Sequence, residues 1–298
     1  MMRVHAIQTG TVEIKENQRR GRGHGPVRLA NTLLDGGWTG PLPVWCWVVE
    51  HPEGVIVVDT GTSAKVLVPG YLPKWNPYYR RNARFSVRPE EEVGPRMREL
   101  GITPEEVRWV VLTHLHVDHD GGLHHFPNAE VLVGRREYDF ATGLAGRATG
   151  YLPNRWPSPF SPTLVDFGEE PVGPFPRSRA LTREGDVLLV GTEGHTAGHL
   201  SVIVREGERS LFLAGDTSYT EGLMLEQAVD GVSPSESPAR ETLRRILRYV
   251  EQTPTVYLPS HDPSSAERLA GRNPAQARDR PVDGVFIGER AEDNEVAR

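Results

Sequence analysis

The sequence predicts an α/β domain in which sheets and helices form layers. Short β-branched runs begin early in the chain, and segments with helical periodicity lie between them, which is the pattern of layered α/β proteins. Polar residues of metal-binding type directly follow several of these runs. Because functional side chains in such domains collect where strands end, we expect the functional site at the strand ends.

The first predicted elements are a hairpin, a helix and a buried strand. Two apolar runs, Val44–Val49 and Val55–Val58, are joined by a compact polar turn, which is typical of paired strands. Residues 69–89 are rich in Pro, Tyr, Trp and Arg and lack periodicity, so we expect a long ordered loop. A helix is predicted over Pro89–Leu100 and a buried strand over Val107–Leu112.

The second half of the chain predicts more strands, two helices and one long insertion. Residues 143–179 are mostly Gly, Pro and aromatic residues, and a loop of that length is uncommon unless it is functional. The other elements are expected, in chain order, as a strand over Ala129–Val133, a helix over Arg135–Thr142, strands over Asp186–Val190, Leu200–Val204 and Ser210–Ala214, a helix over Ser237–Gln252 and a strand over Val256–Leu258.

Composition limits the class of protein. The 298 residues suffice for one large domain, and we expect a single domain over 1–298 with a core at about 42–262 and a charged tail from Asn273. We find no apolar run near the ~20 residues of a membrane span and no signal-peptide pattern, so we predict a cytoplasmic protein without a membrane partner. The net charge of −6 disfavours nucleic acid. The single Cys46 excludes an intrachain disulfide and a multi-cysteine metal site.

The most informative segment is THLHVDHDGG, residues 113–122. It begins where the strand over 107–112 is expected to end. Because residues two apart in an extended chain face the same side, His114 and His116 can point at one metal ion. The chain then bends, which displaces Asp118 and His119 toward the position of a second ion. This segment therefore predicts a metal site.

Three further ligand-type residues, His195, Asp216 and His261, follow other predicted strands. If the Asp216 carboxylate bridges two cations, each cation receives three more protein ligands and leaves room for a shared water, as in catalytic sites. The nitrogen and oxygen donors favour two zinc ions, with Mn, Fe or Co as alternatives. Six histidines are interpreted as packed or surface residues and Asp120 as part of the turn; those histidines are His5, His24, His51, His124, His125 and His199.

The ligand pattern resembles that of the metallo-β-lactamase superfamily over roughly residues 42–262. The motif 114–119 is followed in the expected order by His195, Asp216 and His261, and the Asp59-Thr60-Gly61 turn is also similar. This resemblance implies an αββα sandwich with a dimetal site at one edge of its two sheets. Within the superfamily the chain resembles the N-acyl-homoserine lactonases, through Leu42–Cys46 as their N-terminal strand, Tyr219 three residues after Asp216, and Asp262 after His261.

The resemblance also implies roles for individual residues. One ion would be held by His114, His116 and His195, the other by Asp118, His119 and His261, with Asp216 between them. A metal-bridging hydroxide would open the lactone ring of N-acyl-homoserine lactones, a quorum-quenching reaction. Tyr219 would stabilise the carbonyl oxygen, and Asp118 would pass a proton to the leaving oxygen. Asp59 would either orient a ligand histidine or serve only the turn, and Val117 replaces a bulky aromatic of some members.

Several alternatives stay open. Another dimetal hydrolase of the same fold would act on thioesters, aryl esters or phosphoesters, whereas a diiron redox protein is disfavoured because His116 is not Glu. The arginines at 240, 244, 245 and 248 predict a solvated helix face. Eight loop aromatics would line an acyl-chain pocket, form a homodimer interface or belong to the core: Trp38, Trp75, Tyr78, Tyr79, Phe85, Tyr151, Trp156 and Phe160.

Overall fold

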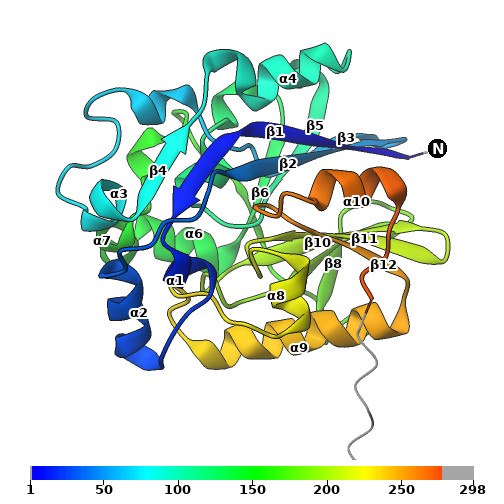
Figure 1. Ribbon diagram of the computed structural model, residues 1–298. Coiled ribbons are helices and arrows are strands. Elements are labelled where there is room, and N and C mark those ends of the chain that lie inside the picture. The colour runs from blue at the N-terminus through cyan, green and yellow to red at the C-terminus, as the bar shows by residue number, and fades with distance from the viewer. Residues whose placement is uncertain (1, 277–298) are drawn as a thin grey trace, which may run out of the picture.

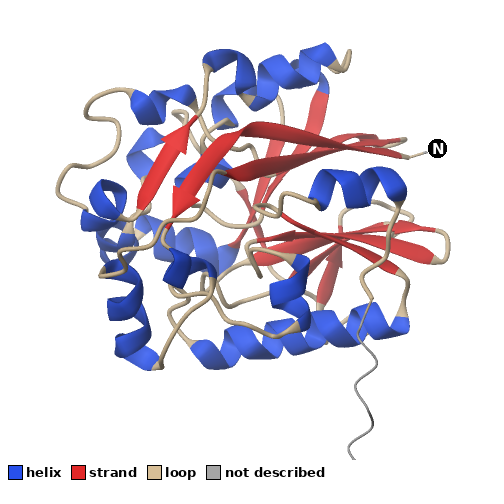
Figure 2. Cartoon of the chain, viewed as in Figure 1, coloured by secondary structure: helices blue, strands red, loops and turns tan. Residues whose placement is uncertain are grey.

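The computed structural model describes residues 2–276, which form two β-sheets packed face to face with helices on both outer faces (Figures 1 and 2). This arrangement confirms the expected αββα sandwich. The predicted charged tail lies mostly outside the described residues. Across the described part of the chain, no helix combines the length and the apolar character needed to cross a membrane.

The larger sheet has seven strands and the smaller has five. In spatial order the larger contains β4 (Ala83–Ser86), β1 (Arg3–Ile14), β2 (Leu42–His51), β3 (Gly54–Val58), β5 (Val107–Leu112), β6 (Glu130–Gly134) and β7 (Thr163–Val165). The smaller contains, also in spatial order, β12 (Thr255–Pro259), β11 (Arg209–Gly215), β10 (Leu200–Glu206), β9 (Val187–Gly191) and β8 (Ser178–Ala180).

Ten α-helices and five short 3-10 helices connect these strands within residues 2–276. The α-helices are α1 (Glu16–Arg19), α2 (Gly25–Leu33), α3 (Pro77–Arg81), α4 (Val93–Glu99), α5 (Val117–Asp120), α6 (Arg135–Thr142), α7 (Leu144–Thr149), α8 (Glu221–Leu225), α9 (Glu236–Gln252) and α10 (Ser265–Gly271). The 3-10 helices are η1 (Ala64–Leu67), η2 (Pro89–Glu91), η3 (Pro104–Glu106), η4 (Leu123–His125) and η5 (Pro153–Arg155).

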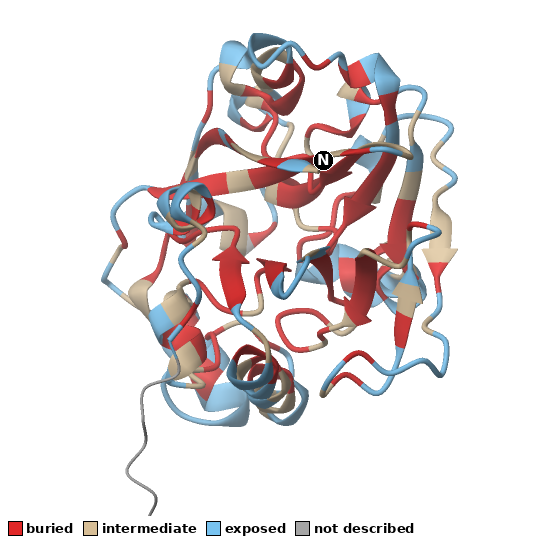
Figure 3. Ribbon diagram, turned by 90° about the vertical axis from the view of Figure 1, so that its right-hand side faces the viewer, coloured by how far each residue is buried: buried red, intermediate tan, exposed pale blue. Residues whose placement is uncertain are grey.

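Both faces of the central strands are buried, as Figure 3 shows for the two sheets. On β5, Trp109 and Val111 pack between the sheets, whereas Val110 and Leu112 pack against α4 on the outer face. Helix α9 covers the outer face of the smaller sheet. A strand buried on both faces has a nearly continuous apolar sequence, and β5, which is apolar except for the exposed Arg108, has the predicted bounds.

The structure corrects the expected N-terminus of the sheet. The segment Leu42–Cys46 is the start of β2, and the first strand is β1, which pairs with β2 along most of its length. β1 escaped prediction because its apolar alternation is interrupted. A bulge shifts the register between Gln8 and Thr11, where Gly10 has φ +75° and lies against the backbone of Ser86.

Two segments predicted as loops contain regular elements. Residues 69–89 hold α3, whose N-terminus is capped by the Asn76 side chain, and β4, which pairs with β1. Residues 143–179 hold α7, η5, β7 and β8, and the two strands extend opposite sheets. These elements have three to six residues, too few for a periodic signal in the sequence.

The strand directions bring the expected site residues to one edge. β3, β5 and β6 are parallel, as are β11 and β12. The carboxyl ends of β3, β5 and β11 lead directly into Asp59, Thr113 and Asp216, and His261 follows β12 after one intervening residue. The predicted β2–β3 hairpin is confirmed, with Trp47 opposite Val58.

Candidate metal centre

All seven predicted ligand residues converge at this edge of the two sheets. Their ligand atoms form three overlapping groups, and within each group the atoms lie within 4.8 Å of one another. The groups are His114 with His116 and His195, His114 with His119 and Asp216, and Asp118 with His119 and His261. The structure thus brings together side chains from four separate strand ends.

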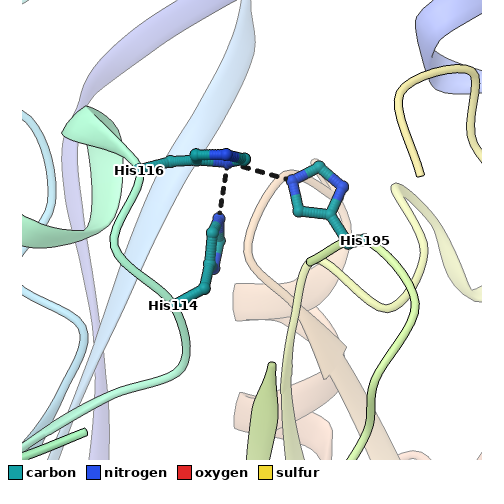
Figure 4. A group of neighbouring side chains, drawn as sticks. All are labelled: His114, His116 and His195. Atoms are coloured by element: carbon teal, nitrogen blue, oxygen red, sulfur yellow. Dashed lines mark hydrogen bonds between the residues drawn. The ribbon is translucent and has the colours of Figure 1, made fainter. Parts of the chain in front are cut away.

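Three imidazoles form one side of the centre (Figure 4). The Nδ1 atom of His116 lies 3.0 Å from Nε2 of His114 and 3.1 Å from Nε2 of His195. Ligand atoms at the usual zinc–nitrogen distance of ~2.0–2.1 Å in a tetrahedral site are about 3.3 Å apart. The spacing of these nitrogens therefore suits one divalent cation.

The Asp216 carboxylate lies between this trio and the other ligand-type residues. Its Oδ1 is 3.4 Å from Nε2 of His119, and its Oδ2 is 3.5 Å from Nε2 of His195 and 3.3 Å from Nε2 of His261. Nε2 of His261 also lies 3.6 Å from Oδ2 of Asp118. A carboxylate placed between two groups of imidazoles can face two cations at once.

Two buried atoms of the centre fit coordination of a cation. Nε2 of His119 and Oδ1 of Asp216 have no hydrogen-bond partner among the described residues. An unsatisfied buried polar atom costs about 1–3 kcal/mol. Divalent cations coordinated by these atoms would satisfy both, so the residues present fit the metal site that the sequence predicts.

Four of the five imidazoles are oriented through their second ring nitrogen. Each Nδ1 lies within hydrogen-bond distance of an oxygen, which leaves the Nε2 lone pair directed into the centre. The pairs are His114 with Thr113 Oγ1 at 3.1 Å, His119 with Asp59 Oδ2 at 2.8 Å, His195 with Asp230 Oδ2 at 3.1 Å and His261 with the Pro43 carbonyl at 2.9 Å.

Asp59 orients the centre in addition to forming its turn. Its Oδ2 contacts His119, and its Oδ1 accepts a hydrogen bond from the Thr113 backbone N–H at 2.8 Å. It holds a left-handed conformation with φ 59°, which non-glycine residues adopt mainly where the surroundings impose it. Of the two roles considered from sequence, the contact with His119 supports the orienting one.

Charge in the centre is divided between neutral and charged groups. Burial, followed by the nearby imidazoles, holds the pKa of His114 and of His116 well below the usual range. For His119, burial acts in the same direction, but the Asp216 and Asp59 carboxylates outweigh it and raise the pKa. Although burial opposes ionisation of Asp216, the His261 and His119 imidazoles hold its pKa well below the usual range. Burial also opposes protonation of His195 and His261, but the Asp230 and Asp216 carboxylates outweigh it and raise the pKa of these two imidazoles. The centre thus combines an ionised carboxylate with imidazole nitrogens, which are donors suited to a divalent cation.

A cavity of about 390 Å³ opens onto the centre. His116, Asp118, Asp216 and His261 lie on its polar side, and α2, α3 and α7 contribute to the opposite wall. The apolar wall includes Val12, Ile14, Leu29, Leu33, Phe85 and Phe140. An apolar wall that faces convergent polar groups is typical of small-molecule sites.

The eight loop aromatics divide among the predicted roles. Tyr78, Tyr79, Phe85 and Tyr151 line the cavity. Trp156 and Phe160 pack against the outer core of the larger sheet. The other two do neither, since Trp38 lies under the Lys15 and Arg84 cations and Trp75 is 64% exposed.

Tyr219 lies between the imidazoles of His195 and His261, which belong to different ligand groups. Its ring stacks on His261 with centroids 5.6 Å apart and meets the His195 ring edge-on at 6.4 Å. The side chain is buried and lines the cavity. The structure therefore places this phenol beside the centre, where the sequence expected it.

Sequence reasoning missed two carboxylates that hold the ligand loops. Asp230 contacts His195, and the Ser233 backbone N–H donates to its other oxygen. Glu137 is fully buried on α6 and accepts hydrogen bonds from the Leu115 N–H at 3.0 Å and the Thr196 hydroxyl at 2.7 Å. It therefore ties the two histidine loops together. Neither residue has a local sequence signal, because the partners lie in distant segments.

The residues set aside from the centre lie outside the three ligand groups. Asp120 is in α5 rather than in a turn, and it accepts a hydrogen bond from Trp156 Nε1 at 2.6 Å. Of the six other histidines, His199 is buried beside the centre and accepts a hydrogen bond from the Asp216 backbone N–H. Three of the four α9 arginines, Arg240, Arg244 and Arg245, pair with Glu236 or Glu241, as expected for a solvated face.

His124 and His125 form a separate group with Glu92, called the Glu92 cluster below. Nε2 of His124 lies 3.2 Å and Nε2 of His125 2.7 Å from Oε2 of Glu92. The other carboxylate oxygen, Oε1, accepts hydrogen bonds from the Ser63 hydroxyl and the Ala64 backbone N–H. Although the three side chains are close enough to hold an ion, these hydrogen bonds account for their arrangement.

Two known proteins of similar sequence are named N-acyl homoserine lactonases. The N-acyl homoserine lactonase AttM of Azorhizobium caulinodans is 27% identical over 280 residues, which cover 89% of this chain and 94% of AttM. The N-acyl homoserine lactonase AiiA of Bacillus thuringiensis subsp. kurstaki is 26% identical over 240 residues, covering 78% of this chain and 86% of AiiA. Homoserine lactones are cyclic esters, so both relatives are hydrolases of carboxylic esters.

Solved structures share the fold. An N-acyl homoserine lactone hydrolase with bound N-hexanoyl-L-homoserine superposes with a TM-score of 0.69 at 20% identity, covering 89% of this chain and 94% of that chain. AidC, described as a dizinc quorum-quenching lactonase, superposes with a TM-score of 0.59 at 14% identity, covering 89% of each chain. The sequence also matches the metallo-β-lactamase superfamily over residues 39–261. The chain belongs to this superfamily, whose fold binds divalent metal ions, and its resemblance to the N-acyl homoserine lactonases is confirmed.

Proposed function

We propose that the protein is a metal-dependent lactonase that opens the ring of N-acyl homoserine lactones, and that it acts in quorum quenching. The observation that carries this proposal is the convergence of seven ligand-type side chains beneath a partly apolar cavity. The names of the similar proteins support the substrate class. The apolar wall suits an acyl chain, and the polar floor suits the lactone ring.

The proposal includes two divalent cations, with zinc first and Mn, Fe or Co as alternatives for the same donors. His114, His116 and His195 would hold one, Asp118, His119 and His261 the other, and the Asp216 carboxylate would contact both. When bound, such cations lower the pKa of a water molecule and polarise an ester carbonyl. The unsatisfied atoms of His119 and Asp216 support this assignment.

Tyr219 would donate a hydrogen bond to the lactone carbonyl oxygen as negative charge develops there. Burial, and then the negative charge of Asp216, raises the pKa of its hydroxyl well above the ordinary value, so the group keeps its proton at neutral pH. Asp118 lines the same cavity with its side chain 15% exposed. From there its carboxylate would accept the proton that the attacking water releases and pass it to the ring oxygen that leaves, which completes opening of the ring to a hydroxy acid.

The runner-up function is hydrolysis of a thioester, aryl ester or phosphoester by the same centre. A hydrolase of this superfamily that is not described as a lactonase, AbOPH, shares the fold with a TM-score of 0.60. The two candidate functions use the same centre, so the shape and chemistry of the cavity distinguish their substrates. An apolar wall near a phenol donor favours the N-acyl lactone.

The test combines metal analysis with a comparison of substrates. The purified protein is assayed by pH-stat on an N-acyl homoserine lactone, a glutathione thioester, an aryl ester and a phosphodiester. We expect the lactone to give the highest kcat/KM and Tyr219→Phe to lower kcat by roughly 10²–10³-fold. Rapid cleavage of another ester with the lactone untouched would refute the substrate, and an unchanged kcat in Tyr219→Phe would refute the role of the phenol.

Homodimer formation and a cytoplasmic location stay predictions. Helix α2 exposes Val27 at 60% and Leu29 at 46%, and Leu34 beyond its end is 84% exposed. Such a patch beside the cavity mouth supports a contact between copies. Sedimentation velocity would test it, with a monomer at micromolar concentration as the contradicting result.

A further inference from the structure

Gln18 connects two phenols of the cavity. It lies in α1, is 3% exposed and lines the cavity. Its Nε2 lies 2.8 Å from the hydroxyl oxygen of Tyr78 and 3.0 Å from that of Tyr219. Its backbone is also fixed, because the Gly231 N–H donates to the Gln18 carbonyl at 2.8 Å. One side-chain amide therefore joins α1, α3 and the loop after β11.

The direction of these hydrogen bonds decides what the phenols can do. The amide nitrogen donates both of its hydrogens, so each phenolic oxygen is an acceptor. The hydroxyl hydrogen of each phenol remains available, and residues 2–276 contain no recorded acceptor for either. The cavity also contains a contrasting phenol, Tyr79, whose hydroxyl already donates to the Gly150 carbonyl.

The two available hydroxyls face the same cavity as the centre. Tyr78 and Tyr219 line it together with Asp118 and Asp216. A phenol has an ordinary pKa of about 10, so both hydroxyls are protonated at neutral pH and can act as donors.

The geometry of the amide separates the two donors. The hydrogens of a planar NH₂ group diverge by about 120°, so acceptors at these distances are held about 5 Å apart. Donors at that separation suit two neighbouring acceptors better than a single oxygen. An N-acyl homoserine lactone has two such acceptors, the ring carbonyl and the amide carbonyl of the acyl chain.

We propose that Gln18 positions Tyr78 and Tyr219 as a pair of donors, with Tyr219 on the ring carbonyl and Tyr78 on the acyl amide carbonyl of the substrate. This inference rests on the proposed function. Tyr78 contacts the substrate, whereas Gln18 acts through the two phenols as a positioning residue. The pair selects lactones that carry an N-acyl group over simple lactones.

The test measures discrimination between an N-hexanoyl homoserine lactone and γ-butyrolactone, which lacks the amide. Tyr78→Phe is expected to lower the ratio of the two kcat/KM values roughly tenfold, mainly through KM for the acylated substrate, as for loss of a neutral hydrogen bond. Tyr219→Phe lowers kcat on both lactones. Tyr79→Phe is the matched comparison and changes the ratio much less, because its hydroxyl is already engaged.

Gln18→Met tests the positioning role. It is expected to raise KM for the acylated lactone and lower kcat together. In the Tyr78→Phe/Tyr219→Phe background, Gln18→Met should not change KM or kcat any further. If Gln18 had only a structural role, its loss would change KM and kcat in that background as well. Thermal unfolding and bound-metal content show whether each variant is intact. If Gln18→Met does not fold, the ratio measured for Tyr78→Phe decides.

Three results would overturn the inference. An unchanged ratio of the two kcat/KM values in Tyr78→Phe means that the Tyr78 hydroxyl does not bind the substrate amide. That result is expected if the Gln18 side chain presents its oxygen, so that both phenols donate to Gln18 instead. Equal losses on both lactones mean that the two phenols serve one oxygen. A wild-type protein that opens neither lactone refutes the proposed function itself, and with it the substrate on which the inference depends.

Discussion

Two clusters of imidazoles and carboxylates in this chain differ in how their side chains are held. In the metal centre, four of five imidazoles contact an oxygen through their second ring nitrogen. In the Glu92 cluster, the recorded contacts of His124 and His125 with Glu92 use Nε2, and none within residues 2–276 involves their Nδ1. The centre keeps its lone pairs turned inward, whereas the cluster donates its N–H groups to a carboxylate.

The burial of the two clusters leads to the same conclusion. In the centre His114 is fully buried and His119 has an unsatisfied Nε2. In the Glu92 cluster the His124 side chain is 34% exposed, and each oxygen of Glu92 has a partner. Both groups therefore place residues of metal-ligand type close together. Of the two, only the metal centre also has imidazoles oriented through their second ring nitrogen and buried polar atoms without a hydrogen-bond partner in the part of the chain that the structure describes.

The largest effect is expected from removing the cations or the carboxylate that they share. Dialysis against a chelator should abolish ester hydrolysis, and added zinc should restore it, because the cations supply several kcal/mol of transition-state stabilisation. Asp216→Asn should lower kcat/KM by about 10³-fold or more for the same reason. Metal analysis by mass spectrometry and pH-stat kinetics check both. Full activity in metal-free protein would contradict the proposed centre.

An intermediate effect is expected from the carboxylates that orient the centre. Asp59→Asn and Asp230→Asn should each weaken metal binding by about 10–100-fold, because a carboxylate on the second ring nitrogen fixes an imidazole. Titration against a zinc buffer measures the affinity. Asp186→Asn is a matched control, since that carboxylate pairs with His51 away from the centre. Equal affinity in all three variants would remove the distinction between the two clusters.

A smaller effect on stability is expected at the Glu92 cluster. Its hydrogen bonds with His124, His125 and Ala64 outweigh burial and hold the pKa of Glu92 below the ordinary value. A depressed carboxyl pKa stabilises the fold above the unfolded pKa of about 4.3, and the contribution is lost as pH falls below it. Glu92→Gln should therefore cost about 1–3 kcal/mol at pH 7 and less at pH 3. Urea unfolding at both pH values measures this, and a pH-independent difference would contradict it.

The smallest effect on metal content is expected from the cluster's imidazoles. His125→Ala should leave the number of bound metal ions unchanged and alter kcat/KM by less than about twofold, because its contacts are hydrogen bonds to Glu92 rather than to the centre. His119→Ala provides the comparison and should lose metal. A bound ion lost from His125→Ala would show that the Glu92 cluster is itself a metal site.

Local pattern was enough to predict two elements beside the centre. Strand β5 and helix α6 have the predicted bounds, because β5 is apolar except for Arg108 and α6 begins directly after a strand. The proximity of His114 and His116 was also predictable, since an extended chain turns both side chains to the same side. By contrast, β1 was missed because its bulge breaks the alternation on which strand prediction depends.

The sequence by itself determined the fold class and the types of ligand, because these follow from patterns that span a few neighbouring residues. Only the tertiary structure decided which groups orient those side chains and which groups line the cavity. Asp59 lies 60 positions from His119, Asp230 lies 35 from His195, and Gln18 lies 201 from Tyr219. Contacts across such separations leave no local periodicity, since they exist only after the two sheets have packed and brought the strand ends together.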